Sequence, residues 1–294
     1  FIMSVPTYEE VPALPFQDSL FPLRNGKYEI TPGLKPVGEA KDLIWDDELL
    51  PRYLAEKRKC REESFEKYYC FREDFEAYDP LISTRLEEAL KEKNIALPPR
   101  DPEKFFYSLD YLTSHLQEDT AVIKRENGHD RLIAIHLSFP NHWDPREKIN
   151  RDFNEVHRPV ADFEPIARRA QQMVNLMVDK GPYTRFAWGL STDTRLNHHP
   201  ESPPGIDPEL WRGRSFDPEN PRLFMRIERQ GTLGFPEIDS ALFTIRTYFL
   251  DVTEIKREIP EARQKLREAI LSMSPATLAY KGLDVDRDAI LDWL

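Results

Sequence analysis

The chain has 294 residues, 40% of them hydrophobic, and a formal net charge of −11 at pH 7. This size and composition are typical of a globular protein with one large domain or two ordinary ones. The acidic excess argues against binding to nucleic acid or to an anionic membrane, because both partners usually require clustered Lys and Arg. No apolar run approaches the roughly 20 residues that span a bilayer, and no secretory leader opens the sequence. We therefore expect a cytoplasmic protein.

The first third of the chain indicates an extended arm followed by helices. From Val5 to Pro36 the sequence is rich in Pro and Gly, with short apolar pieces that suit an arm packed on a domain. Apolar residues at helical spacing and acidic starts then predict three helices. These helices are expected at Trp45–Phe71, Pro80–Asn94 and Pro102–Gln117. Residues 1–118 would form this arm and helical extension.

The apolar pattern changes period after residue 118. Two runs rich in Val, Ile and Leu flank Asn127-Gly128, which predicts a β-hairpin with a tight turn. A helix is predicted in "DFEPIARRAQQMVNLMVDKG", and a covering helix from Ile259 to Met273. Three further strands are expected in "TRFAWGLS", "RLFMRIERQGTL" and "SALFTIRTYFLDV". This order indicates an α+β fold, with a PAS-like antiparallel sheet covered on one side by the intervening helices. Residues 119–294 would form this core, in one integrated domain with the extension.

The sequence lacks the usual motifs for nucleotides. It contains neither G-x-G-x-x-G after a strand nor G-x-x-x-x-G-K-[ST]. The usual phosphate-binding loops for dinucleotides and nucleoside triphosphates are therefore absent. Cys60 and Cys70 are the only cysteines, too few for a four-cysteine zinc site or an all-cysteine iron–sulfur cluster. We expect them to be unpaired thiols in a reducing compartment. If the chemistry is redox, a partner must supply the electrons.

Two histidines in the stretch "NHWDPREKINRDFNEVHRPV" are candidates for metal binding. His142 and Asp144, together with His198 or His199 downstream, imitate the two-His, one-carboxylate set of non-haem iron(II) sites. The short His-Asp spacing is common by chance, and a hydrogen-bonded surface histidine explains His142 as well.

His157 has a different setting. Phe153 and Val156 precede it and Pro159 follows, which places the imidazole at the end of a short helical turn with an apolar approach. One neutral imidazole on an apolar wall suits the proximal ligand of a haem. A hydrogen-bonded core histidine is the alternative that the residues alone leave open.

Four pieces of the sequence together resemble one known family. They are "FPLRNGKYEITPGLKPVGEAKDLIW", "SFPNHWDPREKINRDFNEVHRPVADF", "TRFAWGLS" and "FMRIERQGTLGFPEIDSALFTIRTY", in that order between about Phe21 and Tyr248. The chain resembles the catalytic subunits of haem-dependent oxidative N-demethylases, the dimethylamine monooxygenases. The resemblance implies a PAS-like fold with haem b, and oxygen-dependent removal of an N-methyl group as formaldehyde. It also implies electrons from flavin or iron–sulfur partners.

The resemblance also assigns roles to particular residues. His157 matches the family histidine before x-Pro-Val, which implies the proximal haem ligand. Arg226, Glu228, Arg229 and Gln230 match an Arg-x-Glu-Arg-Gln strand motif, and Trp188 matches the tryptophan of the preceding strand. On this basis Glu228 and Trp188 are expected to be catalytic, and Arg226 and Arg229 to bind the cofactor. Strand alternation places Arg229 on the opposite face from Arg226, Glu228 and Gln230. The motif could instead brace the sheet.

Three functions remain open at this point. The first is a haem-b monooxygenase subunit that acts on a small secondary or tertiary amine and O2, with a reductase partner. The second is a haem-binding gas or redox sensor without turnover, since a fold does not fix a function. The third is the non-haem iron oxygenase built on His142 and Asp144. His142 and the long insertion around His198 and His199 depart from the family pattern, which bears on the substrate more than on the cofactor.

Overall fold

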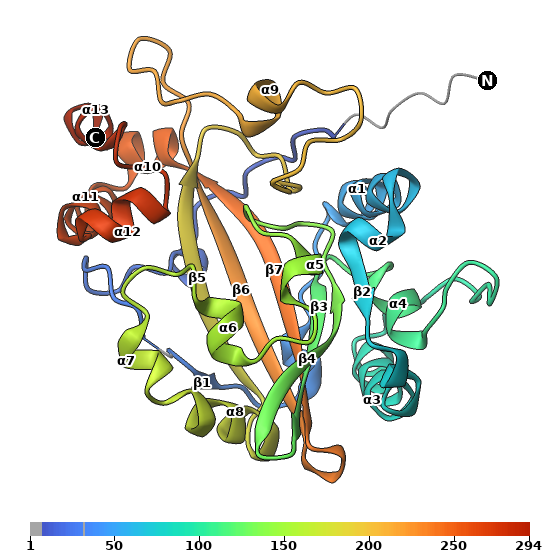
Figure 1. The fold of residues 1–294 in the computed structure, drawn as a ribbon. Coiled ribbons are helices and arrows are strands. Elements are labelled where there is room, and N and C mark those ends of the chain that lie inside the picture. Colours follow the sequence, from blue (N-terminus) through green and yellow to red (C-terminus); the bar gives the residue numbers. More distant parts are fainter. Residues whose placement is uncertain (1–7, 32) are drawn as a thin grey trace.

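A seven-stranded antiparallel sheet is the centre of the molecule (Figure 1). The computed structural model describes residues 8–31 and 33–294. The strand order is β1-β5-β6-β7-β3-β4-β2. The strands are β1 Lys35–Pro36, β2 Tyr69–Phe71, β3 Asp119–Glu126, β4 His129–His136, β5 Tyr183–Ser191, β6 Phe224–Phe235 and β7 Ser240–Asp251. The α+β class predicted from the sequence is confirmed.

Every strand predicted in the second part of the chain is present. Asn127 and Gly128 have φ angles of 51° and 75°, which the tight turn between β3 and β4 requires. The two longest strands, β6 and β7, pair over their whole length from Phe224↔Asp251 to Phe235↔Ser240. The centre of the sheet is therefore a long ladder whose side chains alternate between two faces.

The N-terminal part supplies both edges of this sheet. Strand β1 pairs with β5, and β2 pairs with β4. The predicted helix Trp45–Phe71 divides into α1 Leu50–Glu63 and α2 Phe65–Tyr68 before β2 begins, and the helix predicted at Pro102–Gln117 shortens to α4 Ser108–Thr113. The predicted helix Pro80–Asn94 corresponds to α3 Asp79–Glu92. Residues 8–31 and 33–118 are thus built into the sheet and its covering layers.

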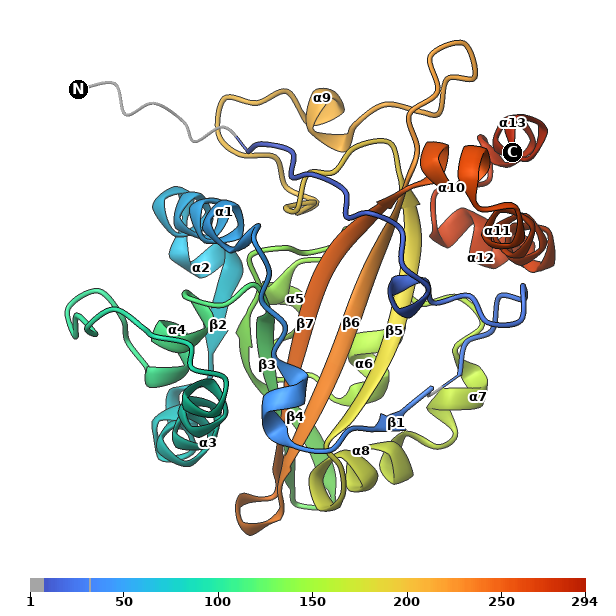
Figure 2. The ribbon, with the colours of Figure 1, turned by 180° about the vertical axis from the view of Figure 1, so that it is seen from behind.

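Different helices cover the two faces of the sheet. The front face, turned to the viewer in Figure 1, carries the helices between β4 and β5. Those helices are α5 Pro145–Lys148, α6 Phe153–His157, α7 Glu164–Ala167 and α8 Ala170–Asp179. The back face packs against η2 Ala40–Leu43, α3 and α4 at one end. The N-terminal arm crosses this back face in Figure 2. The intervening helices thus cover one side, as expected, and the chain ends cover the other.

The C-terminal helices complete the back face. Their bounds are α10 Val252–Glu258, α11 Pro260–Ser272, α12 Pro275–Tyr280 and α13 Arg287–Trp293. Met225, Ile227 and Tyr248 are buried beneath α10, α11 and α13 in one apolar cluster. The predicted covering helix Ile259–Met273 is confirmed as α11. Among the described residues, every helix is too short or too polar to cross a membrane.

A glycine allows α8 to approach the front face closely. A Cβ atom added at Gly234 in β6 would collide with the carbonyl oxygens of Met177 and Val178. Val174, Met177 and Val178 are buried there with Ile123 and Ala241. Close packing of this kind holds α8 against one end of the sheet. The helical layer therefore separates from the sheet only toward the other end of the strands.

Candidate haem site

The middle of the front face carries small and polar side chains that remain partly accessible. Ala187 of β5 pairs with Glu228 of β6, and Glu228 pairs with Thr247 of β7, so all three point to this face. Glu228 and Gln230 are only half-buried although β6 has a strand on each side. A Cβ atom added at Gly189 would meet no atom within 4 Å. We call this space the recess, and define its floor as Arg185, Ala187, Gly189, Glu228 and Gln230.

His157 lies at the last position of α6, the helix opposite this floor. The helix begins with a capping box between Asp152 and Glu155, and Phe153 is buried against the sheet. The His157 ring stacks on Phe163, with ring centroids 4.9 Å apart and planes 11° apart. Helix capping and ring stacking therefore fix the imidazole without a polar side-chain partner.

The hydrogen bonding of His157 selects one tautomer. Its Nδ1 lies 2.7 Å from the carbonyl oxygen of Phe153, and since a carbonyl only accepts, Nδ1 carries the hydrogen. The lone pair is then on Nε2. Burial lowers the pKa of His157 to about 4, so the ring is neutral at pH 7. A neutral imidazole whose other N–H bonds to a backbone carbonyl is the usual state of a metal-binding histidine.

A cation without an ion-pair partner in the described residues lies near this histidine. Arg185 pairs with Gln230 across the ladder, and its charge lowers the pKa of His157, which places the two side chains close together. Burial lowers the pKa of Arg185 itself, and its Nε has no hydrogen-bond partner. Within residues 8–31 and 33–294, no carboxylate forms an ion pair with Arg185 or Lys281. The sequence prediction missed both residues.

Lys281, just after α12, approaches the recess from the open side of β5. Its Nζ donates to the carbonyl oxygen of Trp188 at 2.6 Å and lies 5.0 Å from the centroid of the Tyr28 ring. Burial lowers the pKa of Lys281 to about 8, while the charge of Glu228 opposes that shift. The charge of Glu228 also raises the pKa of Arg185, against the lowering that burial causes. One carboxylate thus serves two largely desolvated cations, and its nearest polar contact is the Nε2 of Gln230 at 2.8 Å.

Arg226 occupies the other end of the recess. The side chain is only 3% exposed, and its guanidinium donates to the carbonyl oxygens of Phe139 at 2.9 Å and Arg195 at 3.2 Å. Those carbonyls belong to the segments that follow β4 and β5. Arg226 therefore holds two loops together at this end.

Arg229 and Trp188 are not brought together with His157. Arg229 projects from the back face and donates to the carbonyl oxygens of Asp42 and Leu43 at 2.6 and 3.2 Å. Trp188 is in register with Ile227, so its indole also lies on the back face, next to the C-terminal helices. Of the residues singled out from the sequence, the structure places Glu228, Gln230 and Arg226 on the same face as His157.

The constellation expected for non-haem iron does not form. The Asp144 carboxylate caps α5 and pairs with Arg146 at 2.7 Å, and it lies 3.6 Å from Nε2 of His199. His142 instead contacts His198, with ring centroids 5.1 Å apart. In the described part of the chain, no group of three or more His, Cys, Asp or Glu side chains is placed to hold a metal ion. The prediction of an iron(II) triad at His142 and Asp144 is therefore wrong.

The residues around the recess fit a haem. One neutral imidazole has its Nδ1 bonded within its own helix and a free Nε2, which could hold the iron of a haem. Arg185 and Lys281 share the negative charge of one carboxylate, Glu228, in a desolvated setting, and two propionates would supply further negative charge. Gly189 leaves open space above the sheet that a larger side chain would enter.

A comparison with protein families identifies the family of this chain. A family model described as haem-dependent oxidative N-demethylase, alpha subunit-like, matches residues 52–291. The match includes β2 to β7, His157, and both cations of the recess. It begins after the piece at Phe21 to Trp45 on which part of the sequence resemblance rested. The chain belongs to the family of haem-dependent oxidative N-demethylase alpha subunit-like proteins.

Proposed function

We propose that this chain is the haem-b-binding oxygenase component of an enzyme that removes a methyl group from a small secondary or tertiary amine. The observation that carries the proposal is the arrangement of His157, whose Nδ1 is held by the Phe153 carbonyl, close to Arg185, which forms no ion pair with a described residue. The sequence contains no C-x-x-C-H motif for covalent attachment, which favours non-covalent haem b.

Each residue of the recess has a defined task in this proposal. His157 would bind the iron through Nε2, and Arg185 and Lys281 would bind the propionates. Glu228, whose carboxylate lies on the floor of the recess, would attract the positively charged amine and orient it. When bound, the haem supplies an iron that binds dioxygen and transfers electrons to it. The α6 layer and the sheet would keep water away from the reacting groups.

The overall reaction fixes what must be supplied from outside. An amine, O2, two electrons and two protons give the demethylated amine, formaldehyde and water. The sequence shows no nucleotide cradle, and its two cysteines are too few for an all-cysteine cluster. An external flavin or iron–sulfur reductase would therefore deliver the electrons, which accords with the alpha-subunit description of the family.

The proposal is tested by haem titration of the purified chain. We expect a Soret band in the wild type, loss of stable haem binding in His157→Ala, and retention of haem in His142→Ala. The physical reason is that a backbone carbonyl holds the Nδ1 hydrogen of His157, which leaves the lone pair on Nε2, and that Arg185 lies close to this ring. Equal loss of haem in both variants would refute the assignment of the ligand.

Amine-dependent oxygen consumption distinguishes an enzyme from a sensor of the same fold. With dithionite or a flavin reductase as electron donor, oxygen consumption should depend on the amine and yield formaldehyde. A haem protein that binds oxygen but consumes none in the presence of any small methylamine would instead be a sensor.

A further inference from the structure

The loop between α6 and α7 is fastened to the C-terminal helices. Asp162 in this loop accepts two hydrogen bonds on its Oδ2 atom, one from Oγ of Ser274 and one from Oγ1 of Thr277 at 2.7 Å. Ser274 is the N-cap residue of α12, and its Oγ also accepts from the amide of Thr277 at 3.0 Å. We call Asp162, Ser274 and Thr277 the latch. It joins the segment that follows His157 to the first turn of α12.

The latch depends on the residue type at position 162. Asp162 has a φ of 58°, a left-handed angle that Asp and Asn tolerate better than most residues. Thr277 is only 1% exposed, and a buried hydroxyl group needs a hydrogen-bond partner, which the Asp162 carboxylate provides. The carboxylate itself lines a surface pocket of about 330 Å³ with Tyr28 and Pro165. The acceptor of the latch therefore lies at the surface, and its threonine donor lies in the interior.

The latch is followed directly by a ring that packs on His157. Phe163 stacks on the imidazole with the ring planes 11° apart, while Phe153 packs on it at 39° with centroids 4.3 Å apart. Phe153 belongs to α6, and its amide donates to Oδ2 of Asp130 at 2.6 Å. Phe163 comes from outside that helix, and its backbone follows that of Asp162. The position of the Phe163 ring therefore depends on the latch as well as on its apolar neighbours.

The helix that carries the donors of the latch is itself tied to the floor of the recess. The amide of Lys281 donates to the carbonyl of Thr277 at 2.9 Å, and its Nζ donates to the carbonyl of Trp188 in β5 at 2.6 Å. The far end of α12 is thus bonded to the sheet. Through the latch, this helix sets the position of the loop after His157 relative to β5.

A hydrogen bond and a parallel ring together restrict the imidazole. The bond from Nδ1 of His157 to the Phe153 carbonyl selects one tautomer, and the flat Phe163 ring opposes a tilt of the imidazole out of its plane. Groups that orient a metal-binding histidine in this way typically contribute a factor of about 10–100 to metal affinity. A ligand that is fixed before the metal arrives also loses less conformational entropy on binding.

We propose that Asp162 is a positioning residue for the haem ligand: the latch holds Phe163 flat against His157 and thereby fixes the plane of the imidazole. The inference rests on the proposed function, because it takes His157 as the ligand. Without the latch, the imidazole keeps its bond to the Phe153 carbonyl but gains freedom to tilt. Haem should still bind to such a chain, but more weakly.

Three substitutions separate the hydrogen bonds of the latch from its backbone angle. Asp162→Gly removes the carboxylate and tolerates the positive φ, whereas Thr277→Val removes one donor from the other side. Asp162→Asn is the conservative variant, because both bonds end on one oxygen and an amide oxygen could accept both. We expect the first two variants to disturb His157, and the third to behave like the wild type.

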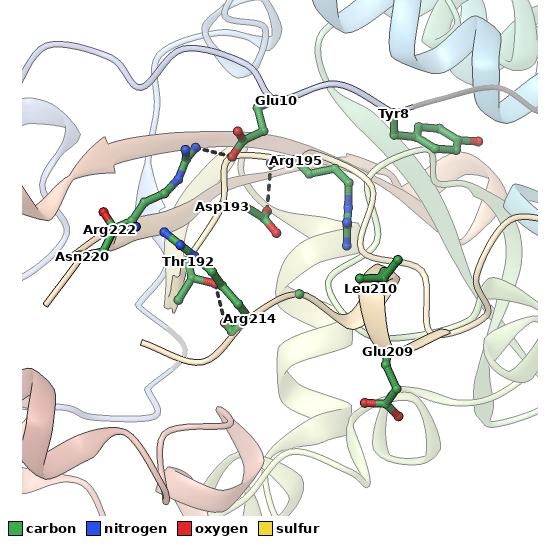
Figure 3. Close-up of a pocket in the computed structure, with 11 residues that line it drawn as sticks. Tyr8, Glu10, Thr192, Asp193, Arg195, Glu209, Leu210, Arg214, Asn220 and Arg222 are labelled. Carbon is green, nitrogen blue, oxygen red and sulfur yellow. Dashed lines mark hydrogen bonds and ion pairs between the residues drawn. The ribbon is translucent and has the colours of Figure 1, made fainter. Parts of the chain in front are cut away.

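Glu10 offers a matched control in another part of the molecule. Its exposed carboxylate also joins two segments, since it accepts from the amide of Thr194 at 3.0 Å and pairs with Arg222 (Figure 3). These contacts tie the N-terminal arm to the insertion after β5, which does not belong to the helical layer around His157. Glu10→Ala should therefore remove a comparable pair of bonds without any effect on the ligand.

The first test uses the chain without haem. The Phe163 ring is stacked on the imidazole, so its ring current should shift the carbon-bound hydrogens of His157 upfield in the proton NMR spectrum. The variant His157→Phe identifies these signals. In Asp162→Gly and Thr277→Val they should move toward the position of an unstacked histidine, and in Asp162→Asn and Glu10→Ala they should stay. Unchanged shifts in both disruptive variants would overturn the proposal, whatever the outcome of haem binding.

The second test measures how fast haem leaves the loaded chain. Transfer of haem to an excess of an apoglobin is followed by absorbance. We expect the rate to rise about 10-fold in Asp162→Gly and Thr277→Val, the lower end of the effects of groups that orient a metal ligand. Asp162→Asn and Glu10→Ala should release haem at the wild-type rate. A wild-type rate in both disruptive variants, or an equal increase in Asp162→Asn, would contradict the role of the latch.

The proposal and the function on which it rests fail in different ways. A wild-type chain that binds no haem would defeat the proposed function, while the NMR shifts would still report whether the latch orients His157. If Asp162→Gly does not fold, Thr277→Val tests the same contact from α12, where valine replaces threonine with little change in shape.

Discussion

At His157, one backbone hydrogen bond and the surrounding apolar rings determine the protonation state. The Phe153 carbonyl binds the Nδ1 hydrogen, and the rings of Phe153 and Phe163 pack against the imidazole. The helical turn and the terminating proline made this residue predictable from the sequence. Its tautomer was not predictable, because it depends on a 2.7 Å contact that only the folded backbone provides.

The depressed pKa of His157 should make the chain without haem sensitive to acid. The folded pKa is about 4 and the unfolded value is near 6.5, so the unfolded state binds the extra proton between them. The free energy of unfolding should therefore fall as the pH decreases through this window, by at most about 3 kcal/mol from this residue. Urea unfolding of the wild type and His157→Phe at pH values across the window measures the difference. An equally steep fall in the variant would contradict the expectation.

The two cations of the recess should have opposite effects with and without haem. Lys281 is largely desolvated and forms no ion pair among the described residues, so Lys281→Met should leave the haem-free chain as stable as the wild type or more stable. The same change removes a charge-assisted bond to a propionate, and haem affinity should fall about 10-fold to 100-fold, or roughly 1.5–3 kcal/mol. Thermal unfolding and haem titration measure the two effects. Unchanged haem affinity in Lys281→Met and in Arg185→Gln would refute the role of these cations.

Among the elements, the long strands were the most predictable from the sequence. Alternating apolar residues in β6 and β7 identify both strands and both faces. Strand β2 was missed because Tyr69–Phe71 follows α2 directly and is too short to show a period. Arg185 was missed although a pattern exists: Arg185, Ala187 and Gly189 alternate with Phe186, Trp188 and Leu190, and a face of small and charged residues opposite an apolar face indicates a lined cavity.

Two glycines of adjacent strands should respond differently to the same substitution. Gly234→Ala forces α8 away from β6, and such overpacking should cost about 1–3 kcal/mol of unfolding free energy. Gly189→Ala adds a methyl group where no atom lies within 4 Å, so the stability of the haem-free chain should be unchanged. Urea unfolding measures both values. A large loss of stability in Gly189→Ala would mean that the recess is closed.

At the scale of the whole molecule, the acidic charge bears on how electrons arrive. The purified chain with amine and oxygen should not oxidise NADH or NADPH. With a basic reductase, turnover should decrease as salt screens the steering field, whose range is about 10 Å at roughly 0.1 M ionic strength. Oxygen electrode measurements at several salt concentrations test this expectation. Stoichiometric NADPH oxidation by the chain alone would reveal a nicotinamide site that its sequence does not show.

The hydrogen bond from Lys281 to the Trp188 carbonyl has a consequence for aggregation. Strand β1 pairs with β5 only at Tyr183 and Thr184, so the remaining edge of β5 has no strand partner in the part of the chain described. Unpaired edges invite another chain to add a strand, and a lysine placed on the edge discourages this addition. If haem propionates attract Lys281, its ammonium moves away from the Trp188 carbonyl at that edge. The bound cofactor then protects the edge of β5 against strand addition in place of the lysine. Chains that lose both the lysine and the cofactor should then associate through β5.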